Sequence, residues 1–172
     1  MQAATPRLVV LLVIDQWPEW SFEAKQAEFH AGGFDRLLRE GTWHVGRHPS
    51  AVTLTAPGHS LLGTGQTTST TGIVANEWWH RDSGRMLQSV EAEDGTVSPK
   101  WLRVAALGDA VAAASTGAKA VSVSLKDRAA VLPLGHHGTA IWYHAKTLDW
   151  TSNTHPAWLD DWNRSQPPRW IV

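Results

Sequence analysis

Hydrophobic and polar positions follow one another along the chain in blocks that predict alternating strands and helices. Residues 7–14 form a continuous apolar, β-branched run, which predicts a strand buried on both faces. Residues 34–41 have helical apolar spacing and end on Gly41, a favoured C-cap, so they predict a short helix. Residues 119–125 alternate like a strand, and residues 139–143 are a further strand candidate.

The middle of the chain predicts a strand, a turn and the start of a helix. Small and β-branched residues 50–55 lead to Pro57, which fits the first turn of a helix that runs to Gly63. Thr55 is therefore expected just ahead of a helix N-terminus. Residues 101–115 have helical apolar spacing, with Gly117 as a stop, and predict a further helix. Strands alternating with helices predict an α/β fold, with a largely parallel sheet flanked by helices.

Composition excludes several classes of protein. The 172 residues suffice for one globular domain, and 42% hydrophobic and 18% charged residues are typical of folded chains. A net charge of -1 with scattered Lys and Arg argues against nucleic-acid binding. The absence of Cys excludes disulfides, thiolate zinc sites and cysteine nucleophiles, so any metal needs His and carboxylate ligands. Eleven tryptophans favour aromatic packing, with a sugar-stacking platform as the alternative.

Targeting signals are not evident. The longest apolar run, residues 8–14, is far shorter than the ~20 residues that cross a bilayer. It leads into Asp15-Gln16-Trp17-Pro18 instead of a small-residue cleavage site. We therefore expect neither a membrane span nor a visible signal peptide.

Two residues at predicted element ends have candidate chemistry. Asp15 follows the first apolar run, where the carboxyl ends of parallel strands gather ligands, although this feature alone favours a turn or capping aspartate. Thr55 lies beside a helix N-terminus, whose free N–H groups favour an anion. It is either a nucleophile beside a bound phosphate or an N-cap, and as a nucleophile it needs activation by a base or metal.

A basic pair follows the strand predicted at residues 119–125. Lys126 and Arg128 stand two apart, and such a pair suits a dianionic phosphoryl group. The alternative is a solvated pair compensated by Asp127. His136-His137 are expected in surface or hydrogen-bonding roles, because adjacent histidines rarely bind one metal together.

Read together, these segments resemble the alkaline phosphatase superfamily. The resemblance is to the phosphate-irrepressible, calcium-associated alkaline phosphatases and the related type I phosphodiesterases. It lies in the segments VVLLVIDQ (9–16), GFDRLLREG (33–41), TLTAPGHSLLGTG (53–65), GIVANEWW (72–79) and SLKDRAAVLPLGH (124–136). The last segment is typical of phosphomonoesterases. No formylglycine motif of the sulfatases, C/S-x-P-x-R, is present.

The resemblance implies a role for each candidate residue. Asp15 becomes a metal ligand, and Thr55 becomes both the nucleophile and a metal ligand. Asn76, Lys126 and Arg128 become ligands of the phosphoryl oxygens. The implied enzyme hydrolyses phosphate monoesters through a phosphothreonine intermediate and two zinc ions, with His59 in a structural role.

The family's remaining metal ligands have no match in this sequence. They are an Asp with a His one turn later, an Asp-His pair and a distant His, and nothing after Arg128 repeats those spacings. Catalytic zinc normally has three protein ligands. We therefore expect residues 1–172 to be the N-terminal part of an alkaline-phosphatase-like catalytic domain. This part is expected to be incomplete at its C-terminus, inactive alone and dependent on a missing C-terminal segment.

Three other functions remain open from the sequence. The intact enzyme is alternatively a phosphodiesterase or nucleotide pyrophosphatase, against which Lys126 and Arg128 argue. The chain is alternatively a non-catalytic phosphate-binding module, or a tryptophan-rich carbohydrate-binding domain. By resemblance, a phosphatase of this type is expected in the periplasm or outside the cell.

Overall fold

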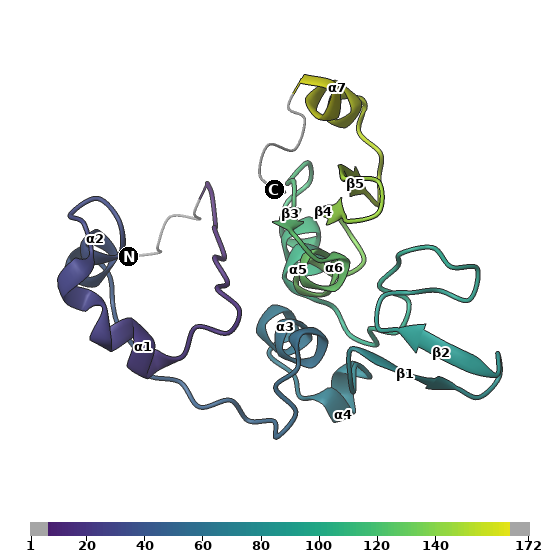
Figure 1. Ribbon diagram of the computed structural model, residues 1–172, viewed down its shortest axis with the longest axis horizontal. Helices are drawn as coiled ribbons and strands as arrows, with labels where there is room; N and C mark the ends of the chain where they lie inside the picture. Colours follow the sequence, from purple (N-terminus) through teal and green to yellow (C-terminus); the bar gives the residue numbers. More distant parts are fainter. Residues whose placement is uncertain (1–6, 166–172) are drawn as a thin grey trace. The chain divides into compact units, whose positions relative to one another are not determined.

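The structure is a computed structural model that describes residues 7–165. The chain divides into two compact units, residues 1–47 and residues 48–172. Figure 1 labels the α-helices and strands of both units. None of the described helices is long and apolar enough to span a membrane.

The first unit is held together by aromatic side chains. It contains α1 (Glu19–Ala24), the 3-10 helix η1 (Gln26–Glu28) and α2 (Phe34–Glu40), and Gly41 is the C-cap of α2 as predicted. Phe22 is 8% exposed and stacks on Trp43 with ring centroids 4.6 Å apart. The other rings that contact Phe22 are Trp17, Phe29 and Phe34. This ring cluster supplies the apolar burial that such short helices lack.

The buried strand predicted for residues 7–14 is wrong. The segment is unpaired chain, and Leu8, Val10 and Leu12 are 79%, 75% and 68% exposed. A strand needs a neighbouring strand for its backbone N–H and C=O groups. The described residues of the first unit contain no strand. The apolar run therefore has no local partner.

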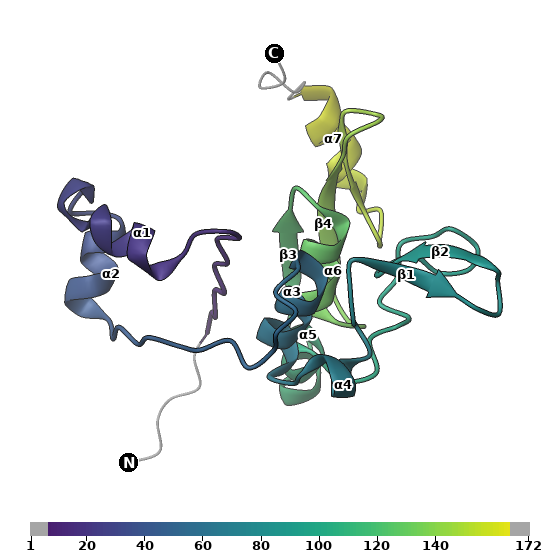
Figure 2. The same cartoon turned by 60° about the horizontal axis from the view of Figure 1, so that its bottom comes forward.

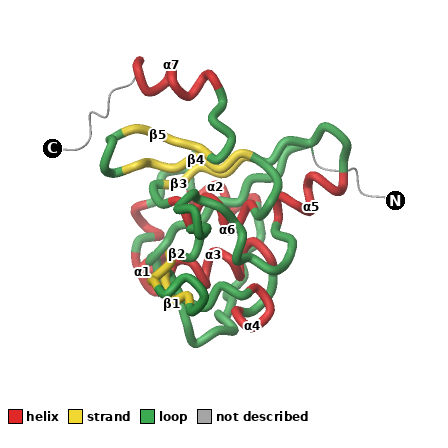
Figure 3. The backbone as a smooth tube through the Cα atoms, turned by 90° about the vertical axis from the view of Figure 1, so that its right-hand side faces the viewer, coloured by secondary structure: helices red, strands yellow, loops and turns green. Residues whose placement is uncertain are grey.

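The second unit is built around a strand–helix–strand crossover. β3 (Val121–Ser124) leads into α6 (Asp127–Leu134) and returns as β4 (Thr139–His144), parallel to β3. β5 (Asp149–Ser152) pairs antiparallel with β4 and completes the sheet, which Figure 3 shows in yellow. Both strands expected here are confirmed. The parallel pair places the carboxyl ends of β3 and β4 at the same edge.

Helix α3 (Thr55–Thr64) packs against α6, and Figures 1 and 2 both show the two helices side by side. A Cβ added to Gly63 would lie 2.5 Å from the Pro133 Cα, so only glycine permits this approach. The helices pack over a common core that reaches the α6-facing side of the sheet. Its fully buried members include Ala56, Ile73, Ala130, Leu132 and Ala140.

The remaining elements surround this core. They are α4 (Thr68–Thr71), the antiparallel hairpin β1 (Glu77–His80) and β2 (Arg85–Gln88), α5 (Leu107–Ala114) and α7 (Ala157–Ser165). The helix predicted at residues 101–115 thus begins six residues later than expected. The cause is local, because the Asp109 carboxylate accepts the Ala106 N–H at 2.8 Å and caps the helix there.

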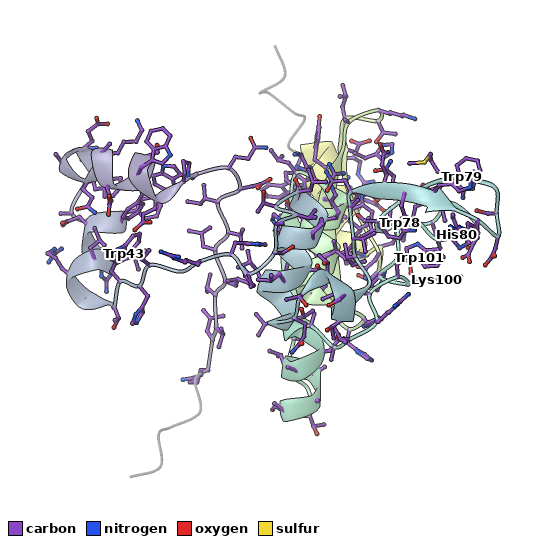
Figure 4. The ribbon with its side chains drawn as sticks, turned by 90° about the horizontal axis from the view of Figure 1, so that it is seen from below. Trp43, Trp78, Trp79, His80, Lys100 and Trp101 are labelled. Atoms are coloured by element: carbon purple, nitrogen blue, oxygen red, sulfur yellow. The ribbon has the colours of Figure 1, made fainter. Side chains whose placement is uncertain are left out.

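Two tryptophans of the second unit, Trp78 and Trp101, pack against its core, whereas Trp79, Trp158 and Trp162 are exposed. Trp78 and Trp101 are partly buried against the core, with ring centroids 6.2 Å apart. Figure 4 shows them grouped with His80 and Lys100, whose ammonium lies 5.1 Å from the Trp101 ring centroid. The Trp101 Nε1–H donates to the Glu91 carbonyl at 2.7 Å. Each half-buried ring has protein partners, which favours packing over a sugar-stacking platform.

Candidate active site

Thr55 is the first residue of α3, within the helix and not just ahead of it as predicted. Its side chain is 9% exposed, and Leu54 holds the extended N-cap position. Pro57 follows in the first turn, as expected, because a proline there removes no intrahelical bond. Thr55 therefore lies among the N-terminal amides of a helix, where the dipole favours negative charge.

Asn76 is brought to the same helix end. Its Oδ1 accepts the Ala56 N–H at 2.8 Å, so a side chain 20 positions along the sequence satisfies the amide next to Thr55. The oxygen of the amide is thus occupied by the helix. The Nδ2 amine can only donate, which makes it the end suited to an anionic oxygen.

His59 fixes the first turn of α3 from within. It is buried at 6% exposure, and its Nδ1–H donates to the Thr55 carbonyl at 2.8 Å. The next residue, Ser60, donates its hydroxyl to the Pro57 carbonyl at 2.9 Å. These bonds hold the backbone that carries Thr55.

Lys126 and Arg128 lie at the start of α6, directly after β3. Lys126 is the exposed N-cap residue, and the Arg128 side chain is 22% exposed. The Asp127 Oδ1 accepts the Arg128 backbone N–H at 2.6 Å and lies 3.8 Å from the guanidinium. Asp127 thus pairs with Arg128, one feature of the alternative in which Asp127 compensates the basic pair.

A pocket of about 280 Å³ opens beside the basic pair. Residues 125–128 line it from the end of β3, and residues 142–146 line it from the end of β4. The lining contains the cations Lys126, Arg128 and Lys146 against the single carboxylate of Asp127. A crevice at the carboxyl ends of parallel strands is where ligands of open α/β sheets gather, and this one favours an anion.

The structure thus gathers four of the five predicted site residues in the second unit. Asn76 is bonded beside Thr55, and Lys126 and Arg128 begin the helix that packs against α3. Asp15 belongs to the first unit, in an exposed turn that follows residues 8–14. In the described part of the chain, no three His, Asp or Glu side chains are grouped so that they could hold a metal ion.

A buried carboxylate that the sequence did not predict braces the far end of α6. Asp109 is 9% exposed and accepts backbone N–H groups of Ala106, His136 and His137 at 2.8 to 2.9 Å. Both histidines also place their Nδ1 within 3.3 Å of it, so they have the hydrogen-bonding role expected. Burial alone would raise the Asp109 pKa, but these hydrogen bonds outweigh it and lower the pKa to about 2.

Gly135 allows this carboxylate to approach the turn after α6. It has a φ of +89°, and a Cβ at this position would lie 2.1 Å from the Asp109 Oδ2. The spacing Ala106-x-x-Asp109 is the only sequence signal that would have pointed to this cluster, because an acid at the third helical position commonly caps a helix.

The chain is similar in sequence to a known family and to several characterised proteins. Residues 9–169 match the family model described as type I phosphodiesterase / nucleotide pyrophosphatase. The chain is 37% identical to alkaline phosphatase PhoV of Synechococcus elongatus over 96% of its length, which is 33% of PhoV. It is 33% identical to alkaline phosphatase PafA of Elizabethkingia meningoseptica over 97% of its length, 34% of that protein. The chain thus spans about a third of the length of these curated relatives.

A solved structure shows the same fold. It is a crystal structure of an alkaline phosphatase PafA mutant, similar with a TM-score of 0.76 and 28% identity over 89% of this chain and 33% of that one. The predicted α/β fold, present as a part of a larger one, is confirmed by this similarity. The PafA mutant carries replacements of one threonine, one asparagine, one lysine and one arginine.

Proposed function

The chain belongs to the type I phosphodiesterase / nucleotide pyrophosphatase family, and from this premise we propose that it forms the nucleophile-bearing third of an alkaline phosphatase. The observation that carries the proposal is the Asn76 bond to the Ala56 amide at the N-terminus of α3, beside Thr55. A basic strand-end pocket lies at the start of α6, and α6 packs against α3. A hydroxyl, an amide donor and two cations are among the groups that phosphoryl transfer needs from a protein.

The PafA mutant supports the proposed residues. Its replaced threonine and asparagine are 21 positions apart, as are Thr55 and Asn76 here. Its replaced lysine and arginine are two positions apart, as are Lys126 and Arg128. The same four residue types thus recur in the same order with the same spacing within each pair.

Each residue then has a distinct role. The Thr55 Oγ forms a bond to phosphorus as the ester P–O bond breaks and the alcohol leaves, which gives phosphothreonine. Water later releases orthophosphate from it. Asn76 donates to one phosphoryl oxygen through Nδ2, while Lys126 and Arg128 neutralise the others. Two cations favour a dianionic monoester over a singly charged diester.

Zinc belongs to the complete enzyme in this proposal. Asp15 and Thr55 offer only two oxygen ligands, whereas catalytic zinc normally has three protein ligands per ion. The described residues contain no metal-binding group of three, so this set does not fit two zinc ions by itself. We propose that the other ligands come from a C-terminal segment, corresponding to the part of the relatives that this chain does not span. A periplasmic or secreted location follows from the same family resemblance.

Phosphodiester or nucleotide pyrophosphate cleavage is the second candidate, because the matching family model bears that name. The two candidates differ in how they use the basic pair. In a monoesterase, Lys126 and Arg128 face a dianion, and their loss affects monoesters more than diesters.

The experiment is a chimera in which this chain replaces the matching third of PhoV. We expect zinc-dependent hydrolysis of an aryl phosphate that exceeds hydrolysis of the aryl diester. Lys126→Ala with Arg128→Ala should lower kcat/KM for the monoester about a hundredfold or more, and for the diester less. A folded chimera that prefers the diester would establish the second candidate instead.

A further inference from the structure

One peptide unit at the start of α3 is held at both ends by side chains. The Thr55 carbonyl accepts the His59 Nδ1–H at 2.8 Å. The Ala56 N–H donates to the Asn76 Oδ1, also at 2.8 Å. Both backbone groups belong to the peptide bond that joins Thr55 to Ala56. Because this bond is planar, with its C=O and N–H pointing in opposite directions, the two hydrogen bonds together oppose rotation of the plane. We call this pair of bonds, from His59 and Asn76, the peptide clamp.

The helix by itself holds this peptide only in part. The first N–H groups of an α-helix have no partner within the helix. Leu54 occupies the N-cap position and makes no side-chain cap bond, so Asn76 supplies the missing acceptor from another segment. A carbonyl oxygen has two lone pairs, so His59 adds a donor to the one that the helix pattern provides. The clamp thus acts on the turn where a helix otherwise frays.

The clamp is buried and its direction is defined. Ala56 is 0% exposed, His59 6% and Thr55 9%, and a hydrogen bond is stronger in such surroundings than in water. Since a carbonyl oxygen only accepts, the His59 Nδ1 has to carry a proton. The dihedral angle that the clamp restricts is the ψ of Thr55. The direction in which the Thr55 side chain leaves the backbone is therefore fixed with it.

We propose that His59 is a positioning residue for the nucleophile: its bond to the Thr55 carbonyl, opposite that of Asn76, fixes where the Thr55 Oγ lies. This inference rests on the proposed function, because it gives His59 a part in the same phosphoryl transfer. Attack on phosphorus needs a narrow range of distance and direction, and a displacement of about 1 Å costs about a hundredfold in rate. The clamp also keeps Thr55 at a fixed separation from Asn76, the proposed ligand of a phosphoryl oxygen.

The clamp is tested first on the 172-residue chain, through hydrogen exchange of the Ala56 amide measured by NMR. His59→Leu nearly keeps the volume of the side chain but removes the donor. It should speed exchange of this amide about tenfold, because the peptide plane then turns more freely. His59→Asn keeps an N–H group close to the position of Nδ1, so it should restore most of the protection.

Thr64→Val is the matched control. The Thr64 Oγ1 donates to the Ser60 carbonyl at 2.7 Å, which is also four residues back in α3. The substitution removes the same kind of bond at the other end of the helix, away from Thr55. It should leave both the exchange of the Ala56 amide and the turnover of the chimera as they are in the parent.

The positioning role is tested in the PhoV chimera. His59→Leu should lower kcat for an aryl phosphate about tenfold or more and change KM by less than about twofold, because Lys126 and Arg128 still bind the phosphoryl group. His59→Asn should recover most of kcat, although its smaller side chain leaves a cavity that lowers the melting temperature. A merely structural role would instead make kcat follow the melting temperature.

Two results would overturn the inference. One is an Ala56 amide that exchanges in His59→Leu as it does in the parent. The other is an active chimera in which His59→Leu keeps the parent's kcat, or in which kcat follows stability in both His59 variants. A chimera without activity, in a chain whose Ala56 amide shows the clamp, would count against the proposed function. The failure of one proposal can therefore be told from the failure of the other.

Discussion

The two units of the chain differ in whether their apolar segments are buried. In the second unit, the apolar residues of α6 and β4 are buried, with Leu132 at 0% and Ile141 at 5% exposure. In the first, the longest apolar run of the chain is exposed, with Leu12 at 68%. Both segments have the pattern of buried structure. Only the second unit contains the strands and helices that cover its own apolar segments.

The difference shows what an apolar pattern encodes. It specifies that a segment will be buried, but the partner has to come from elsewhere in the fold. β3, α6 and β4 are consecutive and form a crossover unit from local sequence. Residues 8–14 have no strand beside them in the described part of their own unit. Their pattern therefore remains unused within it.

The largest expected contrast is between two leucine truncations. Leu132→Ala should lower the free energy of unfolding by about 2–5 kcal/mol, because it leaves a cavity in the core. Leu12→Ala should change it by less than about 0.5 kcal/mol, because the side chain is already in water. Urea unfolding of both variants measures the difference. Equal losses would contradict the contrast between the units.

The PhoV chimera sharpens this comparison. If residues 8–14 pair with strands of the larger fold, Leu12→Ala should become destabilising there by about 2 kcal/mol. Thermal unfolding of the chimera with and without the substitution gives the answer. An unchanged stability would mean that the run stays exposed in the larger fold as well.

The helices and strands that depend on the pattern of consecutive residues were largely predictable from the sequence. The helix at Phe34–Glu40 with its Gly41 cap, the helix that ends after Gly63, both strands of the crossover and the family were all predicted correctly. Asp15, Thr55, Lys126 and Arg128 were candidates from their places at element ends, whereas Asn76 and the role of each residue came from the family resemblance. These roles stay predictions.

What the sequence did not predict depends on pairs that are distant in the chain. The Asn76 bond to Ala56 and the Asp109 brace each join segments about 20 to 30 residues apart. No periodicity marks such contacts. The hairpin of β1 and β2 had a signal in Asp82-Ser83-Gly84, where Gly84 has a φ of +62° and makes the turn.

A smaller effect is expected from acid, which should act on the second unit through Asp109. Its folded pKa of about 2 lies below the ordinary 3.8, so its stabilising contribution is present above about pH 4. That contribution, about 2 kcal/mol, is lost as the pH falls toward 2. Asp109→Asn should remove this pH dependence in melting curves. Asp161→Asn, which breaks an exposed pair with Arg164, serves as the control and should leave it intact.

The smallest expected losses of stability come from removing one side-chain hydrogen bond in each unit. Asn76→Ala should lower the free energy of unfolding by about 1 kcal/mol, because the buried Ala56 N–H loses its acceptor. Arg36→Ala, which breaks an exposed pair with Glu40 in α2, should cost at most about 0.5 kcal/mol. Chemical denaturation distinguishes the two. A larger loss from Arg36→Ala would reverse the comparison.

The central claim is that Thr55 carries the transferred phosphoryl group. The most direct measurement is mass spectrometry of the PhoV chimera, quenched in acid during turnover of an aryl phosphate. We predict one added phosphate on the peptide that contains Thr55, with none in Thr55→Ala, and a loss of turnover of about a thousandfold or more in that variant. Thr55→Ser, which keeps a hydroxyl, should retain a phosphorylated peptide. A Thr55→Ala chimera that still hydrolyses the ester at the parent's rate would contradict the account.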